Sequence, residues 1–362
     1  MGPLPPCRML QSLRVRAARA TPLVLLSCMA AACGGSGPPT GPPTPPPGTP
    51  VSGFVFYDEN ANGIADPSET MRLPGVTVAI GSASAQSSAG GRVTVGSVPA
   101  GAQVASVRPE TLPVYFTAPA SVPVSVPQAS GTEVAVPATL AIGGRNRPRV
   151  YMAFGDSITW GDGSNDGSGY RDYLRANLGT FWGSSHDVPN EGAPGTKSNK
   201  GESRMTPSLV RVRPAYALIL YGTNDYNDGE CRAAPPCYTI DSLRSMILQC
   251  RDNGSLPVLG TIPPVNPNFV DRGATERNEW VKQMNVLLRE MAKQQQVQVA
   301  DIYDAFIKRS DLPALFKDDI HPNETGYTLI AQVWTRALTQ PLGASTSRRG
   351  LPTFFAPPGD LP

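Results

Sequence analysis

The sequence predicts an α/β protein: a doubly wound parallel sheet in three α/β/α layers, preceded by an all-β sandwich domain. From residue 149 onward, short apolar runs alternate with helical stretches, a pattern typical of parallel sheets. Residues 51–142 contain strand-like segments that turn residues interrupt at short intervals, as in a small β-sandwich. The chain of 362 residues suits about two domains plus extensions.

Four strands and four helices are expected in the second domain, predicted at 149–342. The strands are Val150–Phe154, Ala215–Tyr221, Val258–Ile262 and Val297–Ile302. The helices are Gly169–Leu178, Ile240–Arg251, Glu276–Gln295 and Asn323–Leu338. Most of these strands are apolar throughout, as in a sheet buried on both faces. Ligands of such sheets bind beyond the carboxyl ends of the strands, so we expect a functional site there.

The β-domain is expected at residues 51–142. Its strands are predicted at Phe54–Tyr57, Val76–Ile80 and Arg92–Val95, and within the valine-rich stretch Val122–Val136. Pro and Gly recur at 143–148, which indicates a boundary between the two domains.

Residues 1–33 have the layout of an export signal. Arg14, Arg16 and Arg19 precede the apolar run Leu23–Leu26, which is too short to span a bilayer. Small residues before Cys33 resemble a bacterial lipobox, although Ala30 stands where leucine is usual. We expect a lipoprotein at the cell surface or in the periplasm, with Cys33 as its only membrane anchor. Cleavage after the small residues, followed by secretion, is the alternative.

The segments that flank the two domains are expected to be loose. Residues 34–50 consist mainly of Gly, Pro, Thr and Ser, a composition typical of an extended tether. Residues 343–362 form a Ser-, Arg- and Pro-rich tail. Beyond residue 33 the chain carries 27 basic and 29 acidic residues, so we expect no nucleic-acid partner, which would require a basic face.

Three cysteines remain after the export segment: Cys231, Cys237 and Cys250. Export permits disulfides, and the odd number leaves at least one cysteine without a partner in this set. A short bridge between Cys231 and Cys237 is the preferred pairing. Cys250 lies in a helical pattern and is expected to be a buried small hydrophobic residue.

Three short blocks combine the groups that a serine nucleophile requires. They are Gly155–Thr159, Gly222–Asp225 and Asp318–Pro322. Such a nucleophile needs a base to take its proton, a carboxylate to orient the base, and donors for the developing oxyanion. The blocks supply Ser157, His321, Asp318 and the side-chain amide of Asn224. Each block alone is common as a turn or cap, but two of them follow predicted strands, which favours catalysis.

The general base has two candidates, since the chain contains only His186 and His321. Asp318 lies three positions before His321, close enough for its carboxylate to orient the imidazole. His186 lies in a polar loop and is expected to be solvent-exposed or locally hydrogen-bonded. No Gly-x-Ser-x-Gly sequence occurs, which argues against the α/β-hydrolase fold. We expect no metal or cofactor in catalysis.

The three blocks resemble those of the SGNH, or GDSL, hydrolases, which are esterases and lipases built on a flavodoxin-like sheet. The resemblance covers residue 149 to about residue 342. It implies that Ser157 is the nucleophile and that Asp318 and His321 complete a catalytic triad.

The same resemblance implies an oxyanion hole of three donors. They are the side-chain amide of Asn224, the backbone N–H of Ser157 and the backbone N–H of Gly195. Gly192 is the fallback for Gly195, because both glycines lie in the block Asn190–Thr196.

A narrower resemblance concerns the substrate. The segments Gly155–Gly161, Gly169–Arg171, Phe181–Ser184 and Asn190–Gly192 resemble the acetylxylan-esterase branch of the family. This implies an ester substrate in which a polysaccharide carries acetyl groups. The chain has no long apolar segment that resembles a lid for a fatty acyl chain. A lysophospholipase or thioesterase of the same family, and a non-catalytic surface protein that binds glycans, remain the alternatives.

The segment Asp58–Glu69 has the ligand spacing of a calcium loop. Its predicted ligands are Asp58, Asn60, Asn62, the carbonyl of Ile64, Asp66 and Glu69. The segment and the strands around it resemble the SdrD B-like, Cna-B-related modules of bacterial surface proteins. The resemblance implies a calcium-stabilised β-sandwich that serves as a stalk. An Asx-rich turn without metal is the alternative.

Overall fold

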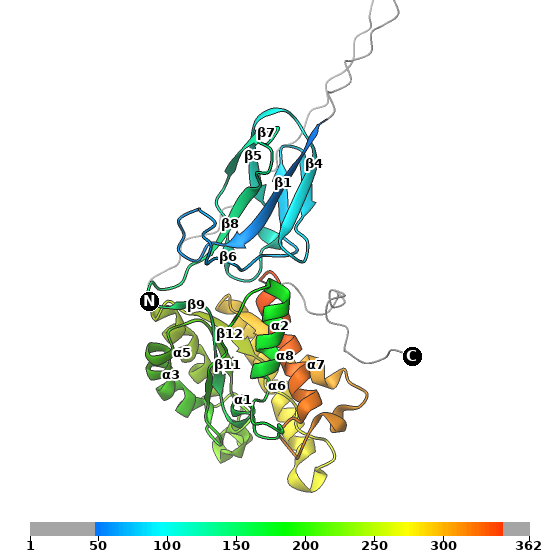
Figure 1. The fold of residues 1–362 in the computed structure, drawn as a ribbon. Helices are drawn as coiled ribbons and strands as arrows, with labels where there is room; N and C mark the ends of the chain where they lie inside the picture. The colour runs from blue at the N-terminus through cyan, green and yellow to red at the C-terminus, as the bar shows by residue number, and fades with distance from the viewer. Residues whose placement is uncertain (1–47, 343–362) are drawn as a thin grey trace, which may run out of the picture. The chain divides into compact units, whose positions relative to one another are not determined.

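The computed structural model describes residues 48–342 (Figure 1). The predicted fold class is confirmed, since a mixed α/β domain with a parallel sheet follows an all-β region. The predicted export segment, the site at Cys33, most of the tether and the tail lie outside the described residues.

Eight strands between residues 49 and 140 form two four-stranded sheets. The strand orders are β4-β1-β8-β6 and β3-β2-β5-β7. The strands are β1 (Thr49–Tyr57), β2 (Thr77–Ile80), β3 (Ala83–Gln86), β4 (Arg92–Val98), β5 (Gly101–Val107), β6 (Phe116–Thr117), β7 (Val122–Val126) and β8 (Val134–Leu140). Along β4, Val93 and Val95 are buried while Thr94 between them is exposed, as expected for strands with one face in a core. β1 begins at Thr49, inside the segment predicted as tether.

The second sheet has five parallel strands in the order β10-β9-β11-β12-β13. They are β9 (Arg147–Gly155), β10 (Asn190–Gly192), β11 (Pro214–Leu220), β12 (Leu256–Gly260) and β13 (Gln298–Ala300). Numbered along this domain, the order is 2-1-3-4-5, which is the flavodoxin-like arrangement. Every predicted strand of this domain is present, and β10 is an additional one.

Helices cover both faces of this sheet. They are α1 (Ser157–Trp160), α2 (Arg171–Trp182), α3 (Ser198–Val212), α4 (Gly229–Ala233), α5 (Thr239–Asp252), α6 (Ala274–Gln294), α7 (Ile302–Ile307) and α8 (Glu324–Thr339). Side chains of α3, α5 and α6 share a core with Val150 and Met152 of β9, whereas α2, α7 and α8 share one with Tyr151 and Ala153. Successive strand residues therefore serve opposite faces. Within residues 48–342, no helix is long and apolar enough to cross a membrane.

Helix α3 is a difference from the sequence-based expectation. It contains Gly201 and Pro207 and is mostly polar, so its helical propensity is low. Met205, Leu209 and Val212 are nevertheless buried at helical spacing. Tertiary packing of that apolar stripe therefore stabilises a helix that local propensity does not predict.

The β-region contacts the amino ends of the parallel strands through two hydrogen bonds. The Tyr115 hydroxyl donates to the carbonyl of Pro257 in β12 at 2.6 Å. The Tyr216 hydroxyl in β11 donates to the carbonyl of Val114 at 3.1 Å. Ser157 and Asn224 follow the carboxyl ends of β9 and β11, so these contacts occur at the opposite end of the sheet.

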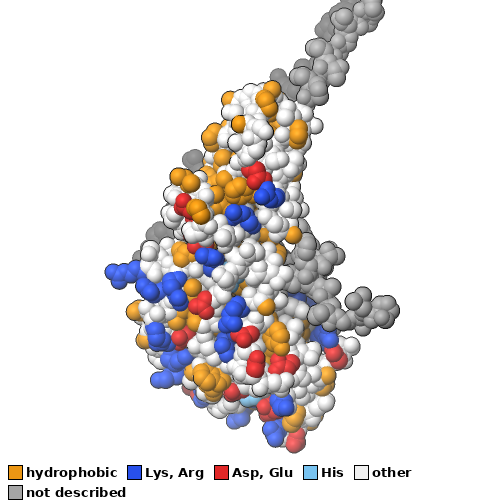
Figure 2. Space-filling model, viewed as in Figure 1, with side chains coloured by type: hydrophobic (Ala, Val, Ile, Leu, Met, Phe, Trp, Pro, Cys, Tyr) orange, Lys and Arg blue, Asp and Glu red, His pale blue; other side chains and the backbone are white. Residues whose placement is uncertain are grey.

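Charges on the face shown in Figure 2 are mixed, with Lys and Arg interspersed among Asp and Glu. This distribution agrees with the near balance of basic and acidic residues in the sequence.

Candidate active site

The first block follows β9 and begins helix α1. At Gly155, a Cβ atom would lie 2.2 Å from Thr159 Oγ1 and 2.4 Å from the carbonyl oxygen of Leu220, so the turn has no room for a side chain. Asp156 caps the helix, with its Oδ1 accepting the N–H of Ile158 at 3.0 Å. Ser157, which is 5% exposed, therefore stands directly beyond the carboxyl end of the strand.

The third block places an imidazole and a carboxylate in line with the Ser157 hydroxyl. His321 Nε2 lies 3.0 Å from Ser157 Oγ, and His321 Nδ1 lies 2.8 Å from Asp318 Oδ2. Asp318 Oδ1 accepts the backbone N–H groups of Ile320 at 2.9 Å and His321 at 2.7 Å. Burial alone would raise the pKa of Asp318, but hydrogen bonds from the backbone and imidazole of His321 lower it below the usual value. An ionised carboxylate can therefore orient the imidazole to take the hydroxyl proton.

The second block is a tight turn after β11. Gly222 has a φ of +123°, a conformation that favours glycine. Nδ2 of Asn224 donates to the carbonyl of Thr196 at 3.1 Å, which uses one of the two N–H groups of the amide. On the other side, Arg277 of α6 donates from Nη2 to the carbonyl of Thr223 at 2.6 Å. Both contacts fix the backbone and side chain of the turn that carries Asn224.

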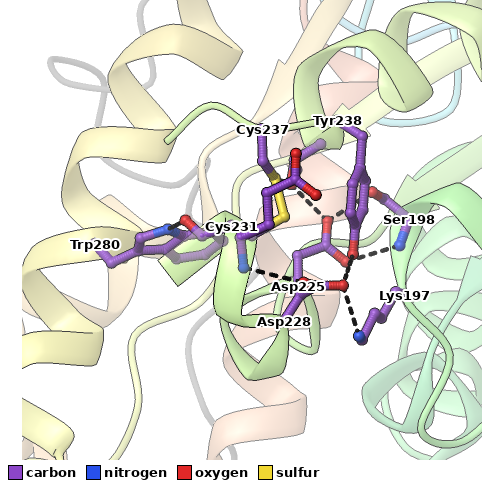
Figure 3. The surroundings of a disulfide bond; sticks show 10 residues. Lys197, Ser198, Asp225, Asp228, Cys231, Cys237, Tyr238 and Trp280 are labelled. Carbon is purple, nitrogen blue, oxygen red and sulfur yellow. Dashed lines mark hydrogen bonds and ion pairs between the residues drawn. A yellow bond between two sulfur atoms is a disulfide. The ribbon is translucent and has the colours of Figure 1, made fainter. Parts of the chain in front are cut away.

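Asp225 anchors this turn to neighbouring helices (Figure 3). Its carboxylate accepts hydrogen bonds from Ser198 N at 2.8 Å, Ser198 Oγ at 2.6 Å and Thr239 Oγ1 at 2.7 Å. Burial raises the pKa of Asp225, and the hydrogen bonds from Ser198 and Thr239 partly oppose that shift. Next to it, Lys197 Nζ pairs with Asp228 at 2.9 Å. The turn is thus held by hydrogen bonds and by an ion pair at its surface.

The loop after the turn is closed by a disulfide between Cys231 and Cys237, the pairing that the sequence favoured (Figure 3). The carbonyl of Cys231 accepts the indole N–H of Trp280 in α6 at 2.9 Å. Cys250 is a buried free thiol, as predicted. Helix α6 therefore contacts the turn through Arg277 and the disulfide-closed loop through Trp280.

The two glycines considered for the oxyanion hole differ in what surrounds them. The N–H of Gly192 donates to Asn190 Oδ1 at 2.9 Å. A Cβ atom on Gly192 would lie 2.3 Å from the backbone N of Trp160, so this glycine is packed against α1. Gly195 is exposed and has a φ of +71°. Because the N–H of Gly192 is already engaged, the geometry favours Gly195.

His186 lies apart from the three blocks. Only 7% of its surface is exposed, and its Nε2 lies 3.0 Å from Ser184 Oγ. Its ring packs against Tyr151 and Trp182, at centroid distances of 5.6 Å and 5.3 Å. Burial, reinforced by the charge of Arg149, lowers the pKa of His186 to about 4. The expectation of local hydrogen bonding is confirmed, and that of solvent exposure is wrong because aromatic side chains cover the loop.

Two buried charged groups at the site were not predicted from the sequence. Asp156 has an Oδ2 atom with no hydrogen-bond partner. Burial raises its pKa to about 7, with a further rise from the charge of Asp225. Arg277 is nine-tenths buried, and burial lowers its pKa. Arg277 lies on the buried face of α6 together with Trp280 and Val281. A charged residue at an otherwise apolar position of this helix is the signal by which the sequence could have indicated it.

The predicted calcium loop Asp58–Glu69 folds on itself. Asp58 Oδ1 and Oδ2 accept the N–H groups of Asn62 at 3.2 Å and Gly63 at 2.8 Å. Asp58 and Glu69 are each 3% exposed. Within residues 48–342, no group of three or more His, Cys, Asp or Glu side chains is placed to hold a metal ion.

The other predicted ligands lie in the same loop. Nδ2 of Asn60 and Nδ2 of Asn62 donate to Asp66 Oδ2 at 2.8 Å and 3.0 Å. Ile64 is exposed, and its N–H donates to Asn62 Oδ1 at 2.7 Å. The loop therefore gathers side-chain oxygens that, in this conformation, accept its own N–H groups.

A hydroxyl, an imidazole and a carboxylate hydrogen-bonded in series beyond a parallel sheet define the class of the protein: it is an ester-hydrolysing serine hydrolase. Residues 153–329 match the model of the GDSL-like lipase/acylhydrolase family.

Individual relatives are similar over about half of this chain. The chain is 26% identical over 181 residues to the uncharacterized lipoprotein YqeF of Bacillus subtilis, covering 43% of this chain and 72% of YqeF. Among solved structures, it is similar to a lipase/acylhydrolase from Enterococcus faecalis at 22% identity, covering 53% of this chain and 95% of that one, with a TM-score of 0.45. It is also similar to a variant of Axe2, an acetyl xylan esterase from Geobacillus stearothermophilus, at 20% identity, the same coverage of both chains and a TM-score of 0.45.

Proposed function

We propose that the protein is an exported esterase that removes short acyl groups, acetyl above all, from carbohydrate. The observation that carries this proposal is the series Ser157–His321–Asp318, with hydrogen-bond distances of 3.0 Å and 2.8 Å. The sequence likeness of the blocks around Ser157 to acetylxylan esterases supports the choice of acetyl groups on a polysaccharide.

The first half of the reaction acylates Ser157. His321 Nε2 takes the hydroxyl proton while Oγ attacks the ester carbonyl carbon, and the carbonyl oxygen becomes an oxyanion. Asp318 stays ionised and stabilises the imidazolium that forms. His321 then gives its proton to the alcohol oxygen, the C–O bond breaks, and an acyl-enzyme remains.

Three donors stabilise the oxyanion in this proposal: the N–H of Ser157, the N–H of Gly195 and the side-chain amide of Asn224. Such donors act most strongly when they are fixed before the charge develops. The hydrogen bonds of Thr196 and Arg277 to the Asn224 turn supply that fixation.

The second half of the reaction regenerates the enzyme. A water molecule gives a proton to His321 Nε2 and attacks the acyl carbon, and the imidazolium then protonates Ser157 Oγ as the acid leaves. All groups used belong to this chain, and the scheme requires no metal or cofactor.

Turnover of p-nitrophenyl acetate, butyrate and decanoate by wild type and Ser157→Ala tests the proposal. We expect selective hydrolysis of acetate by the wild type and a rate at background in the variant. Preference for decanoate would favour a lipase, lysophospholipase or thioesterase. Equal background rates for both proteins would favour the non-catalytic glycan-binding protein.

We also propose that Cys33 carries a lipid anchor, so that the enzyme acts at the cell surface or in the periplasm. The description of YqeF as a lipoprotein supports this assignment. Partition of the full chain into detergent should be lost in Cys33→Ala, whereas partition of that variant like the wild type would contradict the anchor.

The loop Asp58–Glu69 is proposed to hold a structural calcium ion. Two carboxylates buried within one loop, together with carboxamide oxygens, suit a hard cation that binds through oxygen. Asp58, Asn60, Asn62, the carbonyl of Ile64, Asp66 and Glu69 would supply the ligands. A chelator should lower the melting temperature of the wild type, and an unchanged melt would contradict the site.

A further inference from the structure

Trp160 differs from the other tryptophans of the chain. The sequence contains four, all within the described residues. Trp182, Trp280 and Trp334 are at most 4% exposed, whereas Trp160 is 47% exposed. Burial of an aromatic side chain is favourable, and exposed aromatic side chains are enriched where partners bind. An indole left in solvent therefore marks a candidate contact surface.

The exposed indole lies beside the proposed nucleophile. Helix α1 runs from Ser157 to Trp160, so the two residues stand at positions i and i+3. Side chains with this spacing lie on the same face of a helix, with their Cβ atoms about 5–6 Å apart. Trp160 therefore flanks the approach to the Ser157 hydroxyl.

The backbone of Trp160 is held on several sides. Its N–H donates to the carbonyl of Asp156 at 2.9 Å. Its carbonyl accepts Nη2 of Arg171 and Nδ2 of Asn190, both at 3.2 Å. Gly192 also packs against this backbone, where a Cβ atom would approach Trp160 N to 2.3 Å. The indole is thus presented from a fixed base.

A polar segment continues from Trp160 toward the proposed general base. Residues 161–168 contain only Gly, Asp, Ser and Asn. Gly163 lies against the third block, since a Cβ atom there would lie 3.0 Å from His321 Cβ and 2.5 Å from the carbonyl oxygen of Pro322. The segment that continues from Trp160 therefore offers hydrogen-bonding groups and no apolar side chain.

We propose that Trp160 is a platform on which the sugar ring that carries the ester packs. A sugar ring has a face of C–H groups and a rim of hydroxyls. The indole can pack against the C–H face of the sugar, and the polar groups of residues 161–168 can hydrogen-bond to its hydroxyls. A fatty acyl chain would require a continuous apolar groove, which this polar segment does not provide. The inference rests on the proposed esterase function of Ser157, and it deepens that function by naming a residue that selects carbohydrate.

The test compares two kinds of acetyl ester in wild type, Trp160→Ala and Trp160→Phe. One is p-nitrophenyl acetate, and the other is an acetylated sugar, supplied both as acetylated xylo-oligosaccharide and as peracetylated glucose. The measured quantity is kcat/KM on each sugar ester divided by kcat/KM on p-nitrophenyl acetate. The matched control is Val210→Ala, which removes an exposed apolar side chain from a different helix, α3.

The expected result is a ratio that falls about tenfold in Trp160→Ala through a higher KM for the sugar ester, with a smaller fall in Trp160→Phe. Val210→Ala should keep the wild-type ratio. An unchanged ratio in Trp160→Ala would overturn the platform, including the case in which both substrates lose activity equally. Wild type that hydrolyses p-nitrophenyl acetate but neither sugar ester would overturn it too, while the esterase function stands. Failure of the esterase function itself would show as no Ser157-dependent hydrolysis of p-nitrophenyl acetate.

Discussion

Two serine–histidine contacts occur among the described residues, and the distance from hydroxyl oxygen to imidazole nitrogen is 3.0 Å in both. At Ser157, the other imidazole nitrogen of His321 bonds to Asp318. At Ser184, the other nitrogen of His186 is buried without a hydrogen-bond partner. A hydroxyl next to an imidazole therefore does not by itself make a nucleophile. The carboxylate of Asp318 distinguishes the two contacts.

The environments differ in polarity as well. His321 is hydrogen-bonded to the carboxylate of Asp318. His186 packs against the rings of Tyr151 and Trp182, and its burial, reinforced by the charge of Arg149, lowers its pKa to about 4. A histidine that resists protonation at neutral pH is a poor acceptor for the proton of a serine. The comparison predicts that the two pairs respond oppositely to matched substitutions.

The largest effect is expected from removing the two hydroxyls in turn. Ser157→Ala should lower kcat on p-nitrophenyl acetate by at least about 10⁴-fold, because no nucleophile remains. Ser184→Ala should leave kcat within about twofold of the wild type, since no carboxylate is hydrogen-bonded to the imidazole of His186. A comparable loss of kcat in both variants would contradict the assignment of Ser157, and not Ser184, as the nucleophile.

The next effect concerns the carboxylate that only one pair has. Asp318→Asn should lower kcat by roughly 10³–10⁴-fold, because the amide neither stabilises the imidazolium nor fixes the required tautomer. Steady-state kinetics at neutral pH measures this loss, and circular dichroism checks that the variant is folded. A folded Asp318→Asn enzyme with near wild-type kcat would show that the carboxylate is dispensable.

Loss of the side-chain oxyanion donor should cost less. Asn224→Ala is expected to lower kcat by about 10²–10³-fold, with a smaller effect on KM, because the lost hydrogen bond forms to the transition state. Asn227→Ala, a change of the same kind three residues away, serves as control. If KM rises while kcat is kept, Asn224 binds the ground state instead.

A smaller effect is expected from Arg277, which acts through the turn. Arg277→Met removes the hydrogen bond to the carbonyl of Thr223 and should lower kcat about tenfold by loosening the position of Asn224. In the Asn224→Ala background the same change should have little further effect, because the group that it positions is gone. Independent, multiplicative losses would argue against a positioning role.

The smallest effect on activity, and a distinct effect on stability, is expected at His186. His186→Phe should keep kcat within about twofold. In the wild type, the unfolded chain binds a proton at His186 below its ordinary pKa of 6.5, but the folded protein does so only near pH 4. The free energy of unfolding should therefore fall as the pH drops from 6.5 to 4, by on the order of 3 kcal/mol from this residue.

Urea unfolding at several pH values across that window, for wild type and His186→Phe, measures the difference. The variant should lose less stability over the same pH range because it has no imidazole to protonate. Identical pH dependence in the two proteins would contradict the burial of a neutral His186.

The sequence predicted most of the parallel sheet because β9, β11 and β12 contain continuous apolar runs, which are typical of strands buried on both faces. It missed β10, since Asn190–Gly192 is short and polar and becomes a strand by pairing with β9. It missed α3 because the buried stripe of that helix is diluted by Gly201 and Pro207. In both cases, tertiary contacts decide the local structure.

The candidate site was predictable to a similar extent. Ser157, Asp318 and His321 could be named because their chemistry and order are readable along the chain. The packing of His186 between Tyr151 and Trp182 could not, because it depends on residues that only the folded sheet brings together. The same holds for Arg277, whose partner Thr223 is 54 positions away.

The most direct measurement of the central claim is covalent labelling of the wild type with a fluorophosphonate, followed by mass spectrometry of the peptides. An activated serine reacts with such a reagent, and an ordinary one does not. We predict one labelled site at Ser157, with labelling lost in His321→Ala and kept in His186→Phe. Absence of label at Ser157, or equal labelling of Ser184, would contradict the account.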